Sequence, residues 1–304
     1  MSSTCVVDVK KMKGTLTFIK NLSLSLIFAV GALAAVQKTT QKFTLGETEV
    51  KINLYENAGS KVTFFSPHHN EQIARNLAKE FVEKKGGRLV EIESLDTKGK
   101  PSRYINFKAN GKTFSLDPNR IYTENGRNCD SLPAEIDLLV KDFADKLLKL
   151  IFADGKERFI VAVHNNTDVD SKEEHAKQGD LTALAFVKTA GHGTFQSQAE
   201  GAFLSNLEND SDNFIFLSSA KYLGFFVEKS FNVVVQKSAN KLRSTGCNVD
   251  DGSLSVFTAQ NNIQYICLEA DGLSGRLRQQ QMFEAVYALL KEQNAVGDKT
   301  VAVK

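Results

Sequence analysis

Residues 61–94 read KVTFFSPHHNEQIARNLAKEFVEKKGGRLVEIES, and this stretch decides the expected fold. The apolar run 61–66 predicts a strand, and residues 70–87 predict an amphipathic helix that ends at a glycine. Residues 87–94 predict a second strand. A strand, a helix and a strand in this order open an alternating pattern, which indicates the α/β class.

The alternation continues along the rest of the chain. Two alternating runs around Asn110-Gly111, within 103–116, predict a β-hairpin, because this dipeptide favours a tight two-residue turn. Further strands are expected at 157–164, 181–188, 213–219, 231–236, 254–258 and 263–269, and further helices at 131–152, up to Lys229 and at 276–291. The sequence therefore predicts a single α/β domain with a mixed, mostly parallel twisted sheet flanked by helices. In such sheets ligands bind beyond the carboxyl ends of the strands.

The first residues predict an export signal. Four lysines precede the apolar run LSLSLIFAVGALAAV at 22–36, which is shorter than the roughly 20 residues that span a bilayer. Ala32-Leu33-Ala34 offers an A-x-A cleavage site, and Leu33-Ala34-Ala35 is an alternative. We therefore expect a signal peptide over 1–35, a catalytic domain over 36–304, and a secreted or periplasmic protein with no stable membrane span after cleavage.

The charge of the remaining chain does not suggest a nucleic-acid partner. The whole sequence has 38 basic and 36 acidic residues, but residues 1–35 hold four lysines and one aspartate. Residues 36–304 therefore carry 34 basic and 35 acidic side chains. This balance gives no attraction to a phosphate backbone or to an anionic membrane.

Three cysteines remain once Cys5 leaves with the signal. Cys129 and Cys247 lie in polar, loop-like contexts and are the plausible disulfide pair in an exported protein. Cys267 lies in the apolar run IQYICLEA and is expected to be a buried free thiol. The spacing of the three does not match a structural zinc cluster, which needs close pairs.

Two adjacent histidines directly follow the strand 61–66. His68 and Glu71 are three positions apart and can face one way on the first turn of a helix, and imidazole plus carboxylate is a pair of zinc ligands. His69 has Gln72 at the same spacing, which is a poor ligand. The spacing therefore favours His68.

Three more motifs supply groups of matching chemistry. His164 ends the apolar strand of FIVAVHNNTD and can serve as a third ligand, which a catalytic zinc requires. Asn119 and Arg120, in LDPNRIYT, leave the hairpin at a loop, where a guanidinium can bind a substrate carboxylate. Glu269, in YICLEAD, is an acid at the end of an apolar strand, and burial there suits a general base.

These motifs, in this order, resemble the zinc carboxypeptidase superfamily, most closely its aspartoacylase and succinylglutamate desuccinylase branch. SPHHNE resembles the G-x-H-G-N-E of that branch, and DPNRIY resembles its D-L-N-R-x-F. AVHNNT resembles its strand-ending D-L-H-x-x, and CLEAD its late strand glutamate. The resemblance implies a phosphorylase/hydrolase-like fold, Zn²⁺ as cofactor, the zinc ligands His68, Glu71 and His164, the carboxylate-binding pair Asn119 and Arg120, and the catalytic base Glu269.

The resemblance also implies an arginine that stabilises the transition state. Arg103 is the chosen counterpart, and Arg127 is the alternative. Pro67 and His69 stand where the family has glycines. Of the other histidines, His175 is expected to be solvated, and His192 can lie near the substrate on a glycine-flanked loop.

Together these features predict a secreted zinc metallohydrolase. Its expected substrate is a small molecule or peptide with a free carboxylate, and the enzyme cleaves an amide bond of that substrate. It acts either as a metallocarboxypeptidase at a peptide C-terminus or as a deacylase of an N-acyl amino acid. A catalytically silent protein that binds carboxylates or peptides on the same fold is the alternative.

Overall fold

The computed structural model describes residues 36–129, 131–152, 159–166, 182–187, 196–205, 211–238, 241, 246–272 and 274–295. The predicted signal at 1–35 lies outside the described residues, as do His175 and His192. No helix in the described ranges is long and apolar enough to cross a membrane.

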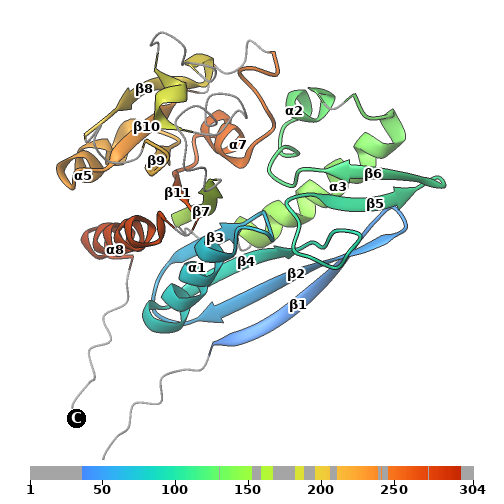
Figure 1. The fold of residues 1–304 in the computed structure, drawn as a ribbon, viewed down its shortest axis with the longest axis horizontal. Coiled ribbons are helices and arrows are strands. Elements are labelled where there is room, and N and C mark those ends of the chain that lie inside the picture. Colours follow the sequence, from blue (N-terminus) through green and yellow to red (C-terminus); the bar gives the residue numbers. More distant parts are fainter. Residues whose placement is uncertain are drawn as a thin grey trace, which may run out of the picture. The chain divides into compact units, whose positions relative to one another are not determined.

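One large mixed sheet organises the described part of the chain (Figure 1). Its strands are β1 (Gln37–Leu45), β2 (Thr48–Asn57), β3 (Val62–Ser66), β4 (Gly87–Glu93), β7 (Phe159–Asn166), β8 (Ala199–Phe203), β9 (Phe214–Leu217), β10 (Asn232–Gln236) and β11 (Tyr265–Asp271). Their order across the sheet is β1-β2-β4-β3-β7-β11-β9-β10-β8. The expected α/β class with a mixed sheet is confirmed.

Parallel pairing is concentrated in the middle of this sheet. β3 pairs in parallel with both β4 and β7, β7 pairs in parallel with β11, and β9 pairs in parallel with β10. The other described pairings, including both edges, are antiparallel. Because β3, β7 and β11 are adjacent and parallel, residues at their carboxyl ends come together at one edge of the sheet.

Helices cover both faces of the sheet. Within the described ranges the α-helices are α1 (Gln72–Lys85), α2 (Glu124–Cys129), α3 (Ala134–Phe152), α5 (Leu223–Glu228), α7 (Leu254–Gln260) and α8 (Arg276–Glu292). One apolar cluster joins α1, α5 and α8 to one face, through side chains such as Phe64, Phe81 and Phe283. The other joins α3 and α7 to the opposite face, through side chains such as Phe65 and Phe143. Successive residues of a strand thus pack against helices on opposite faces of the sheet.

The predicted hairpin is confirmed as a separate two-stranded sheet of β5 (Ile105–Ala109) and β6 (Lys112–Leu116). Asn110 and Gly111 connect them with φ angles of 52° and 70°, the left-handed values that a tight hairpin turn needs. Alternating burial along β5 packs this hairpin over the α3 face. The hairpin delivers the segment 117–120 to the site.

Two predicted strands are wrong. Residues 254–258 lie in α7, because the Ser253 hydroxyl accepts a hydrogen bond from the Val256 backbone and caps a helix there. Within 181–188, the 3₁₀ helix η2 (Ala183–Phe186) forms instead, and the Thr182 hydroxyl caps it by accepting from Leu184 and Ala185. A short apolar run is compatible with a strand or with a helix, and at both places a hydroxyl group that caps the first turn favours the helix.

Candidate functional site

Three predicted metal ligands converge at the carboxyl ends of β3 and β7. The Nδ1 atom of His68 lies 2.6 Å from Oε1 of Glu71, and the Nδ1 atom of His164 lies 3.0 Å from Oε2 of the same carboxylate. All three side chains are buried. The two imidazole rings therefore present the same type of nitrogen to opposite oxygens of one carboxylate.

The start of α1 places Glu71 between the histidines. Glu71 is the residue before the first helical turn, yet its side chain makes no capping hydrogen bond. Its backbone N–H donates to the carbonyl of His68 at 3.3 Å, which closes the turn after β3. The carboxylate is thereby turned away from the helix backbone and toward the rings of His68 and His164.

His69 points elsewhere. Its Nδ1 lies 2.7 Å from the carbonyl oxygen of Ser94, so this nitrogen donates to the end of β4. Arg75 in turn donates to the carbonyl oxygen of His69 at 2.8 Å. His69 therefore attaches the β3–α1 turn to its neighbours and does not face the cluster, which agrees with the choice of His68 from the spacing.

Asp117, to which the sequence motifs assign no role, contacts the other ring nitrogen of His68. Its Oδ1 lies 2.9 Å from Nε2 of His68, and its Oδ2 accepts from Nε of Arg103 at 3.1 Å. Burial alone would raise the pKa of Asp117, but the hydrogen bond from His68 and the charges of both His68 and Arg103 hold it well below its usual range. As the first residue of DPNR, it was visible in the sequence, but only the fold shows that it contacts His68.

This arrangement fits a divalent cation. Because the Asp117 carboxylate is an acceptor, a neutral His68 would keep its hydrogen on Nε2 and turn the lone pair of Nδ1 toward Glu71. Two acceptors 2.6 Å apart repel each other unless a proton or a metal ion lies between them. Among the described residues Nε2 of His164 has no hydrogen-bond partner, and the contact between Glu71 Oε2 and His164 lies outside hydrogen-bond geometry.

The electrostatics of the cluster agree with that fit. Burial lowers the pKa of His68, but the charge of Glu71 and the hydrogen bonds to Asp117 and Glu71 outweigh it, so the pKa is raised. Burial raises the pKa of Glu71, but the charges of His68 and His164 bring it far below its ordinary value. The site thus attracts positive charge, and two imidazoles with a carboxylate are ligands that Zn²⁺ prefers.

Glu269 enters the same site from β11. Residue 269 pairs with His164 across the parallel strands, and its side chain is buried. Burial raises the pKa of Glu269, and the nearby His164 acts in the opposite direction. The carboxyl therefore has the raised basicity that a general base needs.

The two arginine candidates lie in different places. Arg103 follows β4, and its Nη1 lies 3.3 Å from Oε1 of Glu71. Arg127, in contrast, is buried in α2, where it forms an ion pair with Asp137 at 2.8 Å and donates to the carbonyl of Ile121. The structure therefore brings Arg103, and not Arg127, to the predicted ligands.

Asn119 and Arg120 follow β6 at the rim of the site. Nη1 of Arg120 donates to the carbonyl oxygen of Asn119 at 2.9 Å and lies 3.6 Å from Asp251. Oδ1 of Asn119 accepts from the backbone N–H of Leu254 at 3.2 Å. The Arg120 side chain is 34% exposed, so its guanidinium can meet an incoming anion.

The seven predicted site residues all line one cavity of about 380 Å³. Other groups that line it were not predicted as part of the site, and they include Tyr104, Asp117, Asp251, Ser253 and Cys267. Cys267 was expected as a buried thiol, which the structure confirms. Its place two residues before Glu269 on the same strand already puts it on the same face.

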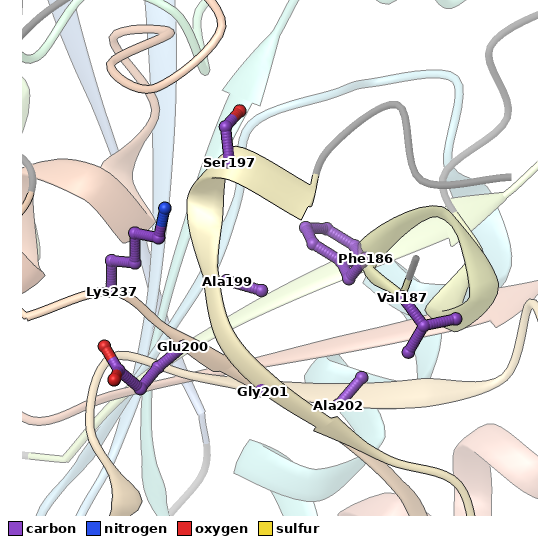
Figure 2. A pocket seen from close by; sticks show the side chains of 8 residues that line it. All are labelled: Phe186, Val187, Ser197, Ala199, Glu200, Gly201, Ala202 and Lys237. Atoms are coloured by element: carbon purple, nitrogen blue, oxygen red, sulfur yellow. The ribbon is translucent and has the colours of Figure 1, made fainter. Parts of the chain in front are cut away.

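A second cavity, of about 540 Å³, lies beside η2 and β8 (Figure 2). Its lining residues are Phe186, Val187, Ser197, Ala199, Glu200, Gly201, Ala202 and Lys237. Its acid, Glu200, is paired with Lys241. These lining residues include no histidine or cysteine, and of the two cavities the smaller one carries the candidate metal ligands.

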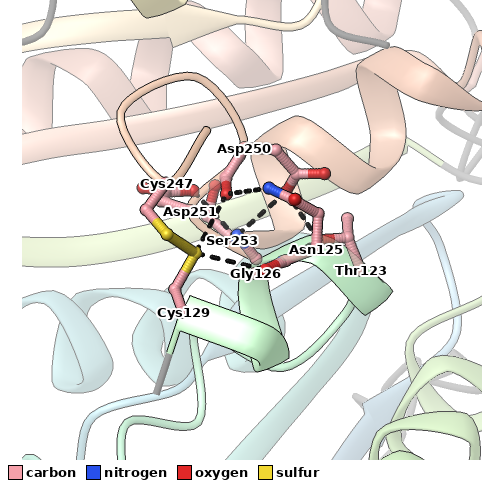
Figure 3. The surroundings of a disulfide bond; sticks show 9 residues. Thr123, Asn125, Gly126, Cys129, Cys247, Asp250, Asp251 and Ser253 are labelled. Carbon is pink, nitrogen blue, oxygen red and sulfur yellow. Dashed lines mark hydrogen bonds between the residues drawn. A yellow bond between two sulfur atoms is a disulfide. The ribbon is translucent and has the colours of Figure 1, made fainter. Parts of the chain in front are cut away.

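A disulfide supports the rim that carries Asp251 (Figure 3). Cys129 and Cys247 are bonded, as the sequence suggests, with their Cα atoms 5.8 Å apart. Asp250, in the same loop as Cys247, adds two hydrogen bonds to the segment that contains α2. Its carboxylate accepts from the Thr123 hydroxyl at 2.5 Å, and its backbone carbonyl accepts from the Asn125 amide at 3.1 Å. The bond therefore fixes the loop at 246–253 to α2, next to Arg120.

Replacing both bonded cysteines by serine is expected to lower the free energy of unfolding by about 2–5 kcal/mol, because the cross-link limits the unfolded chain. Urea denaturation of the variant and of the parent protein measures the loss. The parent protein with a reductant is the control and is expected to show the same shift. An unchanged midpoint in both samples would contradict a stabilising role for the bond between Cys129 and Cys247.

No protein-family model matches the chain, and no curated protein matches its sequence. Solved structures with similar folds include the succinylglutamate desuccinylase from Chromobacterium violaceum, at 13% identity and a TM-score of 0.43, covering 86% of this chain and 72% of the other. The ectoine utilization protein EutE (DoeB) from Ruegeria pomeroyi, with product bound, is similar at 10% identity and a TM-score of 0.40, over 87% and 69% of the two chains. The succinylglutamate desuccinylase/aspartoacylase from Rhodobacter sphaeroides is similar at 11% identity and a TM-score of 0.38, over 86% and 66%.

Proposed function

We propose that this chain is a zinc-dependent hydrolase that cleaves an amide bond in a substrate with a free carboxylate. The observation that supports this most is the convergence of both Nδ1 atoms, of His68 and His164, on the carboxylate of Glu71. Glu269, Arg103 and Arg120 line the same cavity. A binding protein would not require a buried carboxyl of raised pKa beside such a cluster.

In this proposal His68, Glu71 and His164 hold the zinc ion, and Asp117 orients His68. A zinc ion, when bound, acts as a Lewis acid that polarises a carbonyl and increases the acidity of water. In zinc sites a ligating histidine commonly donates its other ring N–H to a carboxylate, and this hydrogen bond fixes the ring tautomer.

The protein's own groups carry the proton and the charge. Glu269 accepts a proton from the attacking water and donates it to the leaving amide nitrogen. Arg103, whose guanidinium is held by Asp117 and Glu71, stabilises the negative charge that develops on the carbonyl oxygen. Asn119 and Arg120 bind the substrate carboxylate and so place the amide bond beside Glu269.

Arg120 provides a test of substrate anchoring. Arg120→Met is expected to raise KM for carboxylate substrates about 10- to 100-fold, because a charge-assisted pair is lost, while kcat changes little. Steady-state kinetics on a peptide with a free C-terminus measures this change. The same peptide with an amidated C-terminus is the matched control, and the variant and the parent protein should process it alike. An equal loss on both substrates would contradict a carboxylate-binding role.

The reaction itself is tested with a mixed library of peptides and N-acyl amino acids. Zinc-loaded protein is incubated with the library, and mass spectrometry identifies the bond that is cut. The proposal expects products from hydrolysis of an amide next to a free carboxylate. A zinc-free protein that binds carboxylates without cleaving them would instead support the binding-protein alternative.

We also propose that the protein is exported. Support comes from the lysines and the apolar run before residue 36 and from the bond between Cys129 and Cys247, since disulfides persist in oxidising compartments. N-terminal sequencing of the protein recovered from the medium or periplasm tests this. A mature start after Ala34 or Ala35 is expected, and an intact N-terminus on a protein retained in the cytosol would contradict the proposal.

A further inference from the structure

One face of β11 carries three cavity side chains in alternate positions. Tyr265, Cys267 and Glu269 are two residues apart from one another, and all three line the cavity that holds the metal-ligand cluster. The strand period of two explains why they share a face. The proposed function assigns a role to Glu269 and leaves Cys267 without one.

The thiol of Cys267 contacts the base directly. Its Sγ lies 3.2 Å from Oε1 of Glu269, and the sulfur is buried. Burial raises the pKa of the thiol well above its ordinary value, and the charge of Glu269 acts in the same direction. The thiol is therefore protonated, and its S–H donates to the carboxylate.

Tyr265 lies on the same face of the strand as this contact. Its side chain is buried, and burial raises the pKa of its hydroxyl well above the ordinary value, with the nearby Cys267 acting in the same direction. The face of β11 thus carries a neutral phenol and a neutral thiol next to the carboxylate of Glu269.

We propose that Cys267 is a positioning residue, whose S–H fixes Oε1 of Glu269 and leaves Oε2 to accept the proton of the attacking water. The role in catalysis rests on the proposed function, but the hydrogen bond itself does not. The competing role is that of a thiolate metal ligand, because Cys267, Glu269 and His164 offer ligand atoms within 4.8 Å of one another.

Infrared spectroscopy of the S–H stretch tests the hydrogen bond without any substrate. In a Cys5→Ser background, with Cys129 and Cys247 bonded, Cys267 is the source of the remaining thiol band. The band is expected at the lowered frequency of a bonded S–H, and Glu269→Gln should raise it. A band at the frequency of an unbonded thiol that Glu269→Gln does not move would overturn the proposal. A band that vanishes on zinc loading would also overturn it, in favour of a thiolate ligand.

Kinetics test the positioning. Cys267→Ala is expected to lower kcat about tenfold with KM within twofold, because the oxygen of Glu269 loses its donor. Cys267→Ser, whose hydroxyl also donates, should keep kcat within about threefold of the parent protein. Equal activity of the alanine variant and the parent protein would reduce Cys267 to a space-filling residue.

The two kinds of failure are separable. If the parent protein itself cleaves no amide, the proposed function fails, and the infrared band still decides whether the thiol is bonded to Glu269. If the parent protein is active but the serine variant is as slow as the alanine variant, the positioning role fails alone. Thermal unfolding of both variants shows whether a loss of kcat comes from a destabilised fold.

Discussion

Glu269→Gln is expected to lower kcat by about 10²- to 10⁴-fold while the protein keeps its zinc. The amide of glutamine keeps the shape of the side chain but cannot accept the proton of the attacking water. In the parent protein, kcat/KM should fall as the pH drops through the pKa of Glu269, since the protonated carboxyl is no longer a base. Because burial raises this pKa, the loss begins at a higher pH than for an exposed glutamate.

The measurement combines steady-state kinetics with metal analysis of the same sample. Glu200→Gln is the matched control, since Glu200 lies in the second cavity and pairs with Lys241. It should keep full activity. A zinc-loaded Glu269→Gln protein with the activity of the parent protein would exclude Glu269 as the base.

His164→Ala is expected to abolish stable zinc binding. The substitution removes one of the three proposed ligands and leaves Glu71 with one imidazole. Loss of a residue that only supports a ligand costs roughly 10- to 100-fold in metal affinity, and loss of a ligand should cost more. Equilibrium dialysis followed by elemental analysis measures the metal bound per chain. Activity should disappear with the zinc.

His69→Ala is the matched control for this loss. It removes an imidazole next to His68 whose nitrogen donates to Ser94 and not to the cluster. This variant is expected to bind zinc as the parent protein does. If His69→Ala lost the metal and His164→Ala retained it, the ligand assignment would be wrong.

The central part of the fold was predictable because its signals are local. The strand, helix and strand of residues 61–94 show clear periodicity, and Asn110-Gly111 marks the hairpin. β1 gave no such signal, because it is an edge strand whose residues are almost all exposed and therefore lack an alternating pattern. The helix over residues 254–258 was not predicted, because its apolar run is too short to distinguish a helix from a strand. The cap at Ser253 stabilises the helix there.

The candidate site was predictable to the extent that its residues belong to motifs. The sequence places His68, His164 and Glu269 at the ends of strands, and adjacency of β3, β7 and β11 brings them together. Asp117 was missed because its partner, His68, lies 49 positions away, and no periodicity connects them. The choice between Arg103 and Arg127 likewise needed the fold, since it depends on which loop packs beside Glu71.

The most direct test of the central claim is the X-ray absorption spectrum of the zinc-loaded protein at the zinc edge. The ligand set of His68, Glu71 and His164 predicts one zinc ion per chain with only nitrogen and oxygen neighbours, at about 2.0–2.2 Å. Scattering from two imidazole rings should be visible, and His164→Ala should remove it. A sulfur neighbour at about 2.3 Å, or the absence of stoichiometric zinc, would contradict the account.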